Sequence, residues 1–211
     1  MARPVLYVLA GVNGAGKSSI GGHLLARDGL TWFNPDRFAR ELMAATNCDQ
    51  ETANGHAWAE GVRMLDEAIA KGQSYAFETT LGGRTITARI QAAVHTHDVI
   101  IWFCGLHSPE HHLLRVQARV SQGGHDIPEA KIRARYPRAQ QNLIALMPHV
   151  ARLRAYDNSA EATIGQAVPD PLLVLELEAG RLVHPAADDR AALERTPDWA
   201  KALVAAALAL G

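Results

Sequence analysis

A chain of 211 residues can bury one substantial core and is most simply organised as a single domain over residues 1–211. Its 21 lysines and arginines nearly balance its 22 aspartates and glutamates, which argues against bulk attraction to nucleic acid. Cys48 and Cys104 have no metal-site spacing and form no disulfide framework. Because we find no signal-peptide pattern and no apolar stretch long enough to span a bilayer, we expect a cytoplasmic protein without a membrane partner.

An apolar run at residues 5–10 predicts a buried strand, and it leads into Gly-Val-Asn-Gly-Ala-Gly-Lys-Ser at residues 11–18. This octapeptide matches the phosphate-loop pattern G-x-x-x-x-G-K-[ST], and a helix-like segment follows it to about Arg27. In such a loop backbone N–H groups surround phosphate oxygens, the lysine reaches the β- and γ-phosphates, and the serine hydroxyl joins a Mg²⁺ shell. We therefore predict a nucleoside triphosphate site formed by Gly11, Asn13, Gly14, Ala15, Gly16, Lys17, Ser18 and Ser19, with Ser18 as the metal ligand.

Strand-like and helix-like segments alternate along the rest of the chain, which is typical of a parallel sheet covered by helices. The predicted strands are 30–34, 74–78, 98–106, 153–156, 172–177 and 181–183. The predicted helices are 35–45, 50–71, 85–94, 109–122, 128–150 with an interruption at Pro137, and 199–210. Residues 160–169 are the expected loose loop. We expect a three-layer α/β fold with a mostly parallel sheet, extended over about residues 170–211 by an edge hairpin and a C-terminal helix.

Two classes of P-loop protein are excluded by what accompanies the loop. Residues 121–125, Ser-Gln-Gly-Gly-His, superficially resemble the signature of ABC ATPases, but the polar, helical residues 128–133 follow where those proteins have a Walker B strand ending in Asp-Glu. A GTPase would need an Asn-Lys-x-Asp guanine motif, which this chain lacks. Small kinases and other single-domain phosphoryl-transfer enzymes remain.

A kinase must hold an acceptor hydroxyl in line with the γ-phosphate and help to remove its proton. Asp36 follows the predicted second strand at the sheet edge that carries the phosphate loop, so its carboxylate could accept that proton or could simply cap the next helix. Glu78 ends another strand and could orient Mg²⁺, bind substrate hydroxyls, or pair with a nearby arginine. Thr79 and Thr80 could line an acceptor pocket or form an ordinary turn toward Arg84.

Arginines flank the Gly-Gly-His-Asp turn at residues 123–126, in a helix–turn–helix arrangement suited to closing over a nucleotide and countering phosphate charge. Their spacing does not separate substrate-contacting arginines from those of a solvated face. The candidates are Arg115, Arg119, Arg133, Arg135 and Arg138.

Histidines and tryptophans carry weaker signals. His107, His111 and His112 lack a third ligand of suitable spacing, so we predict solvated positions at a helix start rather than a metal site. The tryptophans are predicted to serve core or partner-facing packing; they are Trp32, Trp58, Trp102 and Trp199.

In combination, the phosphate loop, Asn34-Pro35-Asp36, Phe77-Glu78-Thr79-Thr80 and residues 123–136 resemble the zeta-toxin-like P-loop kinases. They are most similar to the compact stand-alone branch often labelled predicted ABC-type ATPases. The well-known zeta toxins phosphorylate the 3′-hydroxyl of the amino sugar in UDP-N-acetylglucosamine with ATP and Mg²⁺. The resemblance therefore implies ATP and Mg²⁺ as cofactors, a sugar nucleotide as small-molecule substrate, and an antitoxin protein as a partner.

The resemblance also implies residue roles. Lys17 and Ser18 would bind phosphates and Mg²⁺, Asp36 would act as general base, and Glu78 would contact the acceptor or the metal shell. Arg119 matches the first charge-neutralising arginine, and the second is Arg133 or Arg135, of which Arg135 is preferred because Arg-Tyr belongs to the matched motif. The implied catalytic residues are Lys17, Asp36, Arg119 and Arg135, and the candidate substrate-binding residues are Asp36, Glu78, Thr79, Thr80 and Arg84.

Three functions stay open at the level of sequence, because Thr79-Thr80 stands where the well-known toxins have a glycine-containing sequence. The first is a sugar-nucleotide kinase. The second is a kinase of another nucleotide, an NAD-like dinucleotide or a nucleic-acid end. The third is an ATP-binding toxin–antitoxin interaction module whose hydrolysis is incidental.

Overall fold

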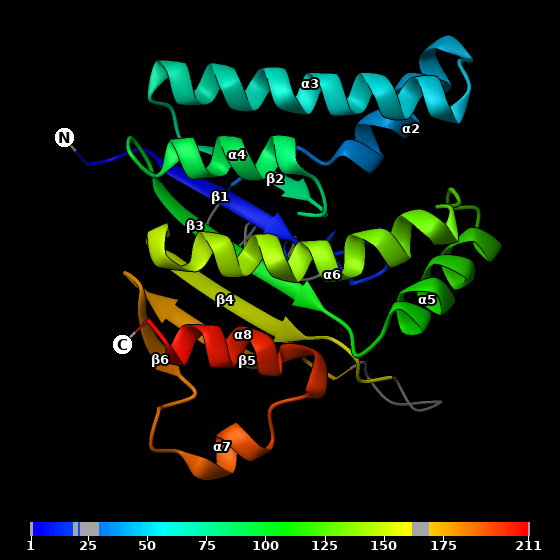
Figure 1. Ribbon diagram of the computed structural model, residues 1–211. Coiled ribbons are helices and arrows are strands. Elements are labelled where there is room, and N and C mark those ends of the chain that lie inside the picture. Colours follow the sequence, from blue (N-terminus) through cyan, green and yellow to red (C-terminus); the bar gives the residue numbers. More distant parts are fainter. Residues whose placement is uncertain (1, 19–20, 22–29, 162–168, 211) are drawn as a thin grey trace.

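The computed structural model describes residues 2–18, 21, 30–161 and 169–210, and within them a six-stranded sheet forms the centre (Figure 1). The strands are β1 (Val5–Ala10), β2 (Tyr75–Thr79), β3 (Asp98–Gly105), β4 (Arg152–Asp157), β5 (Leu172–Glu178) and β6 (Arg181–His184). Their order is β2-β1-β3-β4-β5-β6; β1 to β4 run parallel, and β5 and β6 add an antiparallel hairpin. The predicted α/β class, mostly parallel sheet and edge hairpin are confirmed.

The helices connect and cover these strands. They are α2 (Pro35–Thr46), α3 (Gln50–Lys71), α4 (Arg84–Ala93), α5 (Pro109–Ser121), α6 (Glu129–Leu146), a 3₁₀ turn at Met147–His149, α7 (Arg190–Glu194) and α8 (Asp198–Leu208). Asn34, Asp49 and Ser108 cap α2, α3 and α5, since each side chain accepts a hydrogen bond from a backbone N–H in the first turn. Local chemistry therefore sets where three of the helices begin.

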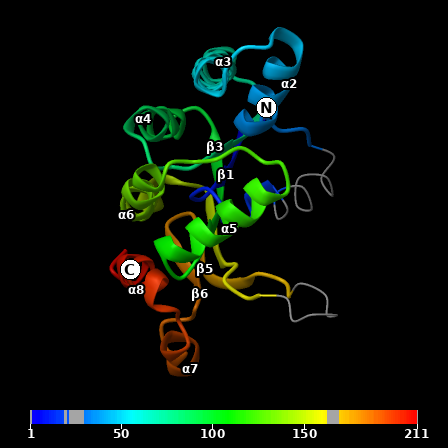
Figure 2. The ribbon, with the colours of Figure 1, turned by 90° about the vertical axis from the view of Figure 1, so that its right-hand side faces the viewer.

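Helices α3, α4, α6 and α8 lie side by side over one face of the sheet (Figures 1 and 2). The central strands present fully buried side chains to this layer, among them Val8, Ile101 and Leu153. A smaller buried cluster includes Leu9 and Trp102 of the same strands. Strands β1 and β3 are thus apolar on both faces, as expected for interior strands of a parallel sheet.

The predicted strand at 30–34 is reduced to a single parallel bridge between Phe33 and Phe77. The Phe33 N–H donates to the Ala76 carbonyl at 2.9 Å, and the Phe33 carbonyl accepts from the Glu78 N–H at 2.9 Å. Pairing stops there because α2 begins at Pro35, immediately after its cap.

Helix α6 runs through Pro137, so the predicted interruption there is wrong. Ile132 before the proline and Ala139 and Leu143 after it are all fully buried in the main core. Tertiary packing on both sides therefore outweighs the lost N–H and keeps one helix. The short helix α7 was not predicted. Three predictions lie largely outside the described residues: the helix that was expected to end near Arg27, the nucleotide contact of Ser19, and the loop at 160–169.

No helix among the described residues has the length and apolarity needed to cross a bilayer.

Core packing around β4 yields a stability prediction. Leu153 is fully buried, so Leu153→Ala should lower the free energy of unfolding by about 2–5 kcal/mol in urea denaturation followed by circular dichroism. The matched control is Leu172→Ala on β5, whose side chain is 58% exposed and whose loss should change stability by about 0.5 kcal/mol or less. Equal effects of the two substitutions would contradict this description of the core.

Candidate active site

The phosphate loop lies at the carboxyl edge of the sheet, where the neighbouring strands support it. The Gly11 N–H donates to the Thr79 carbonyl at 3.2 Å, at the end of β2. The amide of Asn158, which follows β4, donates to the Ala15 carbonyl at 2.9 Å. Gly16 has a positive φ of 84°, and a Cβ there would overlap the Asn158 amide, so the position requires glycine for two reasons.

Side chains from α5 and α6 hold Asn13 in the middle of the loop. Arg135 of α6 donates to the Asn13 side-chain oxygen at 2.8 Å. The His112 ring of α5 contacts the Asn13 carbonyl through Nδ1 at 2.8 Å, which assigns the proton to Nδ1 because a carbonyl only accepts. Burial, with a smaller contribution from the charge of Lys17, lowers the pKa of His112 to about 4, although the hydrogen bond to Asn13 opposes this shift. His112 is therefore a neutral donor at pH 7.

Glu78 is the centre of a buried polar network beside Ser18. Its carboxylate accepts hydrogen bonds from Trp32 Nε1 at 2.9 Å, from Asn34 Nδ2 at 2.9 Å and from the Ser18 hydroxyl at 3.3 Å. Only 7% of Glu78 is exposed, so these donors compensate for the burial of its charge. The Asn34 amide also donates to the Ser18 hydroxyl at 3.2 Å. The network fixes the Ser18 side chain next to a carboxylate.

This pair of oxygen donors fits Mg²⁺, which prefers hard oxygen ligands and usually keeps several waters and substrate phosphates in its shell. The Ser18 hydroxyl would bind the metal directly, and the Glu78 carboxylate would orient that hydroxyl or a metal-bound water by hydrogen bonding. Within the described ranges no cluster of three or more histidine, cysteine, aspartate or glutamate side chains could hold a metal by itself. A site of this kind depends on the phosphates as well as on the protein.

Asp36 lies in the first turn of α2 but does not cap it, because the Asn34 side chain accepts from the Arg37 N–H at 3.0 Å. The carboxylate instead faces two cationic or polar groups from the 119–125 region. Arg119 Nη1 is 3.5 Å from one carboxylate oxygen, and His125 Nε2 is 3.7 Å from the other. Burial lowers the pKa of His125, and Asp36 opposes that shift. Asp36 therefore has a half-exposed carboxylate beside the phosphate loop.

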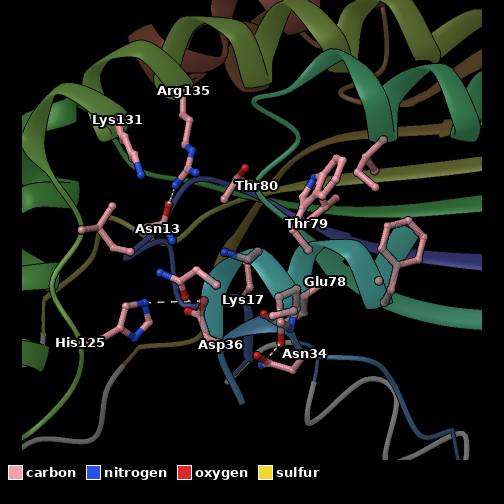
Figure 3. A pocket seen from close by; sticks show the side chains of 18 of the residues that line it. Asn13, Lys17, Asn34, Asp36, Glu78, Thr79, Thr80, His125, Lys131 and Arg135 are labelled. Atoms are coloured by element: carbon pink, nitrogen blue, oxygen red, sulfur yellow. Dashed lines mark hydrogen bonds and ion pairs between the residues drawn. The ribbon is translucent and has the colours of Figure 1, made fainter. Parts of the chain in front are cut away.

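A cavity of about 250 Å³ opens between these groups. Figure 3 shows Lys131 and Arg135 reaching from α6 toward the loop, while Asp36 and His125 face each other nearby. Its polar lining includes Asn13, Lys17, Asn34, Asp36, Glu78, Thr79, Thr80, His125, Asp126, Lys131 and Arg135. A phosphate anchor, a carboxylate and further cations thus converge on one space.

The structure separates the arginine candidates. Arg135 lines the cavity and Arg119 contacts Asp36, whereas Arg133 forms exposed ion pairs with Glu110 and Glu129. Arg138 is exposed, and Arg115 donates to the Ala160 carbonyl at 3.2 Å. Of the candidate substrate-binding residues, Thr79 and Thr80 line the cavity, but Arg84 is exposed at the start of α4 and does not line it.

Several cavity residues were not singled out by the sequence. They include Asn54 and Lys131, which carry no motif of their own, whereas Trp58 was expected only to serve packing. The histidine prediction is wrong for His111 and His112, which are 3% and 1% exposed. Both follow the cap of α5 by one turn, but this helix start is packed against the phosphate loop rather than solvated. Trp58 is 56% exposed, so it does not belong to the core.

The Glu78 network yields a metal-dependence prediction. Glu78→Gln keeps an oxygen acceptor for Trp32 and Asn34 but removes the negative charge beside Ser18. The Mg²⁺ concentration needed for half-maximal ATP turnover should rise about 10-fold or more. The control is Glu176→Gln, which removes a carboxylate of similar burial that pairs with Arg154 between β4 and β5. The same Mg²⁺ requirement in both variants would refute a role for Glu78 at the metal.

Solved structures share this fold at low sequence identity. The complex AvrRxo1-ORF1:AvrRxo1-ORF2 contains a chain that matches with a TM-score of 0.67 and 15% identity, over 94% of this chain and 65% of that one. This chain therefore spans less than two thirds of that relative's length. The PezAT toxin–antitoxin system of Streptococcus pneumoniae gives a TM-score of 0.55 and 17% identity, over 74% of this chain and 69% of that one.

A putative kinase from Chloroflexus aurantiacus matches with a TM-score of 0.50 and 19% identity, over 58% of this chain and 70% of that one. No curated protein sequence matches this chain. The family model described as zeta toxin matches residues 1–164, which include the phosphate loop, Asp36, Glu78, Arg119 and Arg135. Because that model covers most of the sequence, the chain belongs to the zeta toxin family.

Proposed function

We propose that this chain is an ATP- and Mg²⁺-dependent kinase that transfers the γ-phosphate to a hydroxyl of a small molecule. The observation that carries the proposal is the position of Asp36. Its carboxylate lines the same cavity as Lys17 and Arg135, at the edge of the sheet where the phosphate loop lies. A kinase needs space for its acceptor beside the γ-phosphate and a group that can accept the proton of the acceptor hydroxyl, and this cavity offers both.

Each residue of the site has a proposed role in phosphate transfer that follows from its chemistry. ATP supplies the phosphoryl group, which the loop N–H groups and Lys17 hold from one side. Asp36 accepts the proton that leaves the acceptor hydroxyl as its oxygen bonds to the phosphorus. Arg135 and Arg119 counter negative charge on the phosphoryl oxygens, and Ser18 with Glu78 would hold Mg²⁺, which would supply further positive charge there.

Thr79 and Thr80 are proposed to contact the acceptor, because they line the cavity at the end of β2 next to Glu78. Their hydroxyls also accept from the Leu81 and Gly82 N–H groups, which fixes the turn that follows the strand. Arg84 would reach an acceptor only if the acceptor extended beyond the cavity. The cavity wall thus has hydroxyl and carboxylate groups suited to a polyhydroxylated acceptor.

UDP-N-acetylglucosamine is the acceptor proposed first, in keeping with the zeta-toxin resemblance. Other nucleotides, an NAD-like dinucleotide or a nucleic-acid end are the alternatives. Incubation of the protein with ATP, Mg²⁺ and UDP-N-acetylglucosamine should yield a product with one added phosphate, detected by mass spectrometry. Transfer to a different metabolite would replace the acceptor and keep the kinase, and an absence of transfer to any metabolite would overturn the kinase.

An antitoxin is a proposed protein partner. The matched PezAT structure is described as a toxin–antitoxin system, and the AvrRxo1 match is a complex of two proteins. The same resemblance leaves room for an ATP-binding interaction module. Multiple turnovers of phosphate transfer by the purified chain would exclude a purely structural role.

A further inference from the structure

One wall of the cavity comes from α3, through Asn54, Ala57, Trp58 and Gly61. Counted from Asn54 as position i, they fall at i, i+3, i+4 and i+7, so they share one face of the helix. Two of them are small: Ala57 is 2% exposed, and Gly61 packs so closely on the Phe33 ring that a Cβ would lie 2.9 Å from it. The small side chains leave the large one between them accessible.

That large side chain is Trp58, which is 56% exposed although it lines the cavity. Trp32, Trp102 and Trp199 pack within the protein, with Trp102 and Trp199 7% and 6% exposed. An indole left open in the cavity offers a flat apolar face that water solvates poorly. Such a face is suited to a planar ring that lies on it.

The positively charged side chains of α6 and the phosphate loop indicate a second chemical group of the ligand. Lys131 and Arg135 reach into the cavity from α6, and Lys17 reaches it from the phosphate loop (Figure 3). The ATP phosphates account for Lys17 and one arginine. Lys131 remains as a cation suited to a phosphate of the second substrate. A nucleotide combines such a planar ring with a phosphate.

We infer that Trp58 is a specificity-determining residue that stacks on the base of a nucleotide acceptor, while Asn54, one turn earlier on α3, faces the edge of that base. The inference rests on the proposed kinase function, since it assigns the acceptor of the same site. The Asn54 amide can both donate and accept, and Gln50 already donates to its oxygen at 3.0 Å. A sugar phosphate without a base lacks the group that this wall recognises.

Calorimetric binding tests this assignment with the full chain and its phosphate loop saturated by a non-hydrolysable ATP analogue and Mg²⁺. The probes are the monophosphates of uridine, adenosine, guanosine and cytidine, with ribose 5-phosphate as the base-free comparison. At least one nucleotide should bind about 10-fold or more tightly than ribose 5-phosphate. Trp58→Ala should weaken that nucleotide about 10-fold or more, and Trp58→Phe should retain most of the affinity.

The control variant is Leu172→Ala, which removes an apolar side chain of similar exposure outside the cavity and should leave nucleotide affinity unchanged. Equal nucleotide binding by Trp58→Ala and the unmodified protein would overturn the assignment, as would binding of none of the four nucleotides by protein that binds the ATP analogue. Phosphate transfer to a base-free sugar phosphate with Trp58→Ala fully active would overturn it and leave the kinase standing. Failure to bind the ATP analogue would instead contradict the proposed function itself.

Discussion

Asp36→Asn should lower the turnover number of phosphate transfer about 10²–10⁴-fold, the usual contribution of a positioned general base. The substitution is isosteric and keeps a polar group beside Arg119 and His125, so the loop that carries His125 stays in place. What is lost is the proton acceptor. Because Asp36 does not cap α2, the helix itself should be unaffected.

The signature of this defect is a separation between binding and turnover. ATP affinity of Asp36→Asn, measured by calorimetry, should match that of the unmodified protein within about 3-fold, since Lys17 and the loop N–H groups are untouched. Asp66→Asn is the matched control, because Asp66 is a half-exposed aspartate that pairs with Arg89 on the outer side of α3 and α4. Undiminished turnover in Asp36→Asn would exclude Asp36 as the base.

Lys17→Ala should reduce both ATP affinity and turnover, with turnover falling about 10²–10³-fold. Lys17 lines the cavity and is the cation of the phosphate loop that would contact both the bound nucleotide and the phosphoryl group during its transfer. Its removal therefore acts on ground state and transition state together, unlike Asp36→Asn.

The control for the loss of a positive charge is Lys71→Ala, which removes an exposed lysine paired with Glu67 at the end of α3. That variant should bind and turn over ATP like the unmodified protein. If Lys17→Ala retained the affinity of the Lys71→Ala control for ATP, the loop would not be the nucleotide site.

The sequence was most informative where chemistry is local. The phosphate-loop motif acts over a few residues, and most helix boundaries lie within a few residues of those predicted, although Asn34 rather than Asp36 caps α2. Asp36 and Glu78 were singled out because the first follows and the second ends a predicted strand at one edge of the sheet, and both side chains line the cavity. The preference for Arg135 over Arg133 agrees with the side chain's position at Asn13.

Other parts of the site depend on contacts between distant segments. His112 looked like a solvated helix-start histidine, but α5 packs its first turn on the phosphate loop 99 residues earlier. Trp58 was expected to serve core or partner-facing packing, and its exposure excludes only the core. Pro137 looked like a helix break, and the core on both sides of it holds the helix together. No periodicity or motif in the sequence encodes these neighbours.

The central claim is that the chain transfers phosphate to a small molecule rather than only binding or hydrolysing ATP. It is tested most directly by incubating the purified protein and Asp36→Asn with ATP, Mg²⁺ and a deproteinised metabolite extract, followed by untargeted mass spectrometry. The account predicts that at least one nucleotide-containing metabolite gains one phosphate with the unmodified protein and does not with Asp36→Asn. Consumption of ATP to ADP and free phosphate, with no metabolite phosphorylated beyond the Asp36→Asn sample, would contradict it.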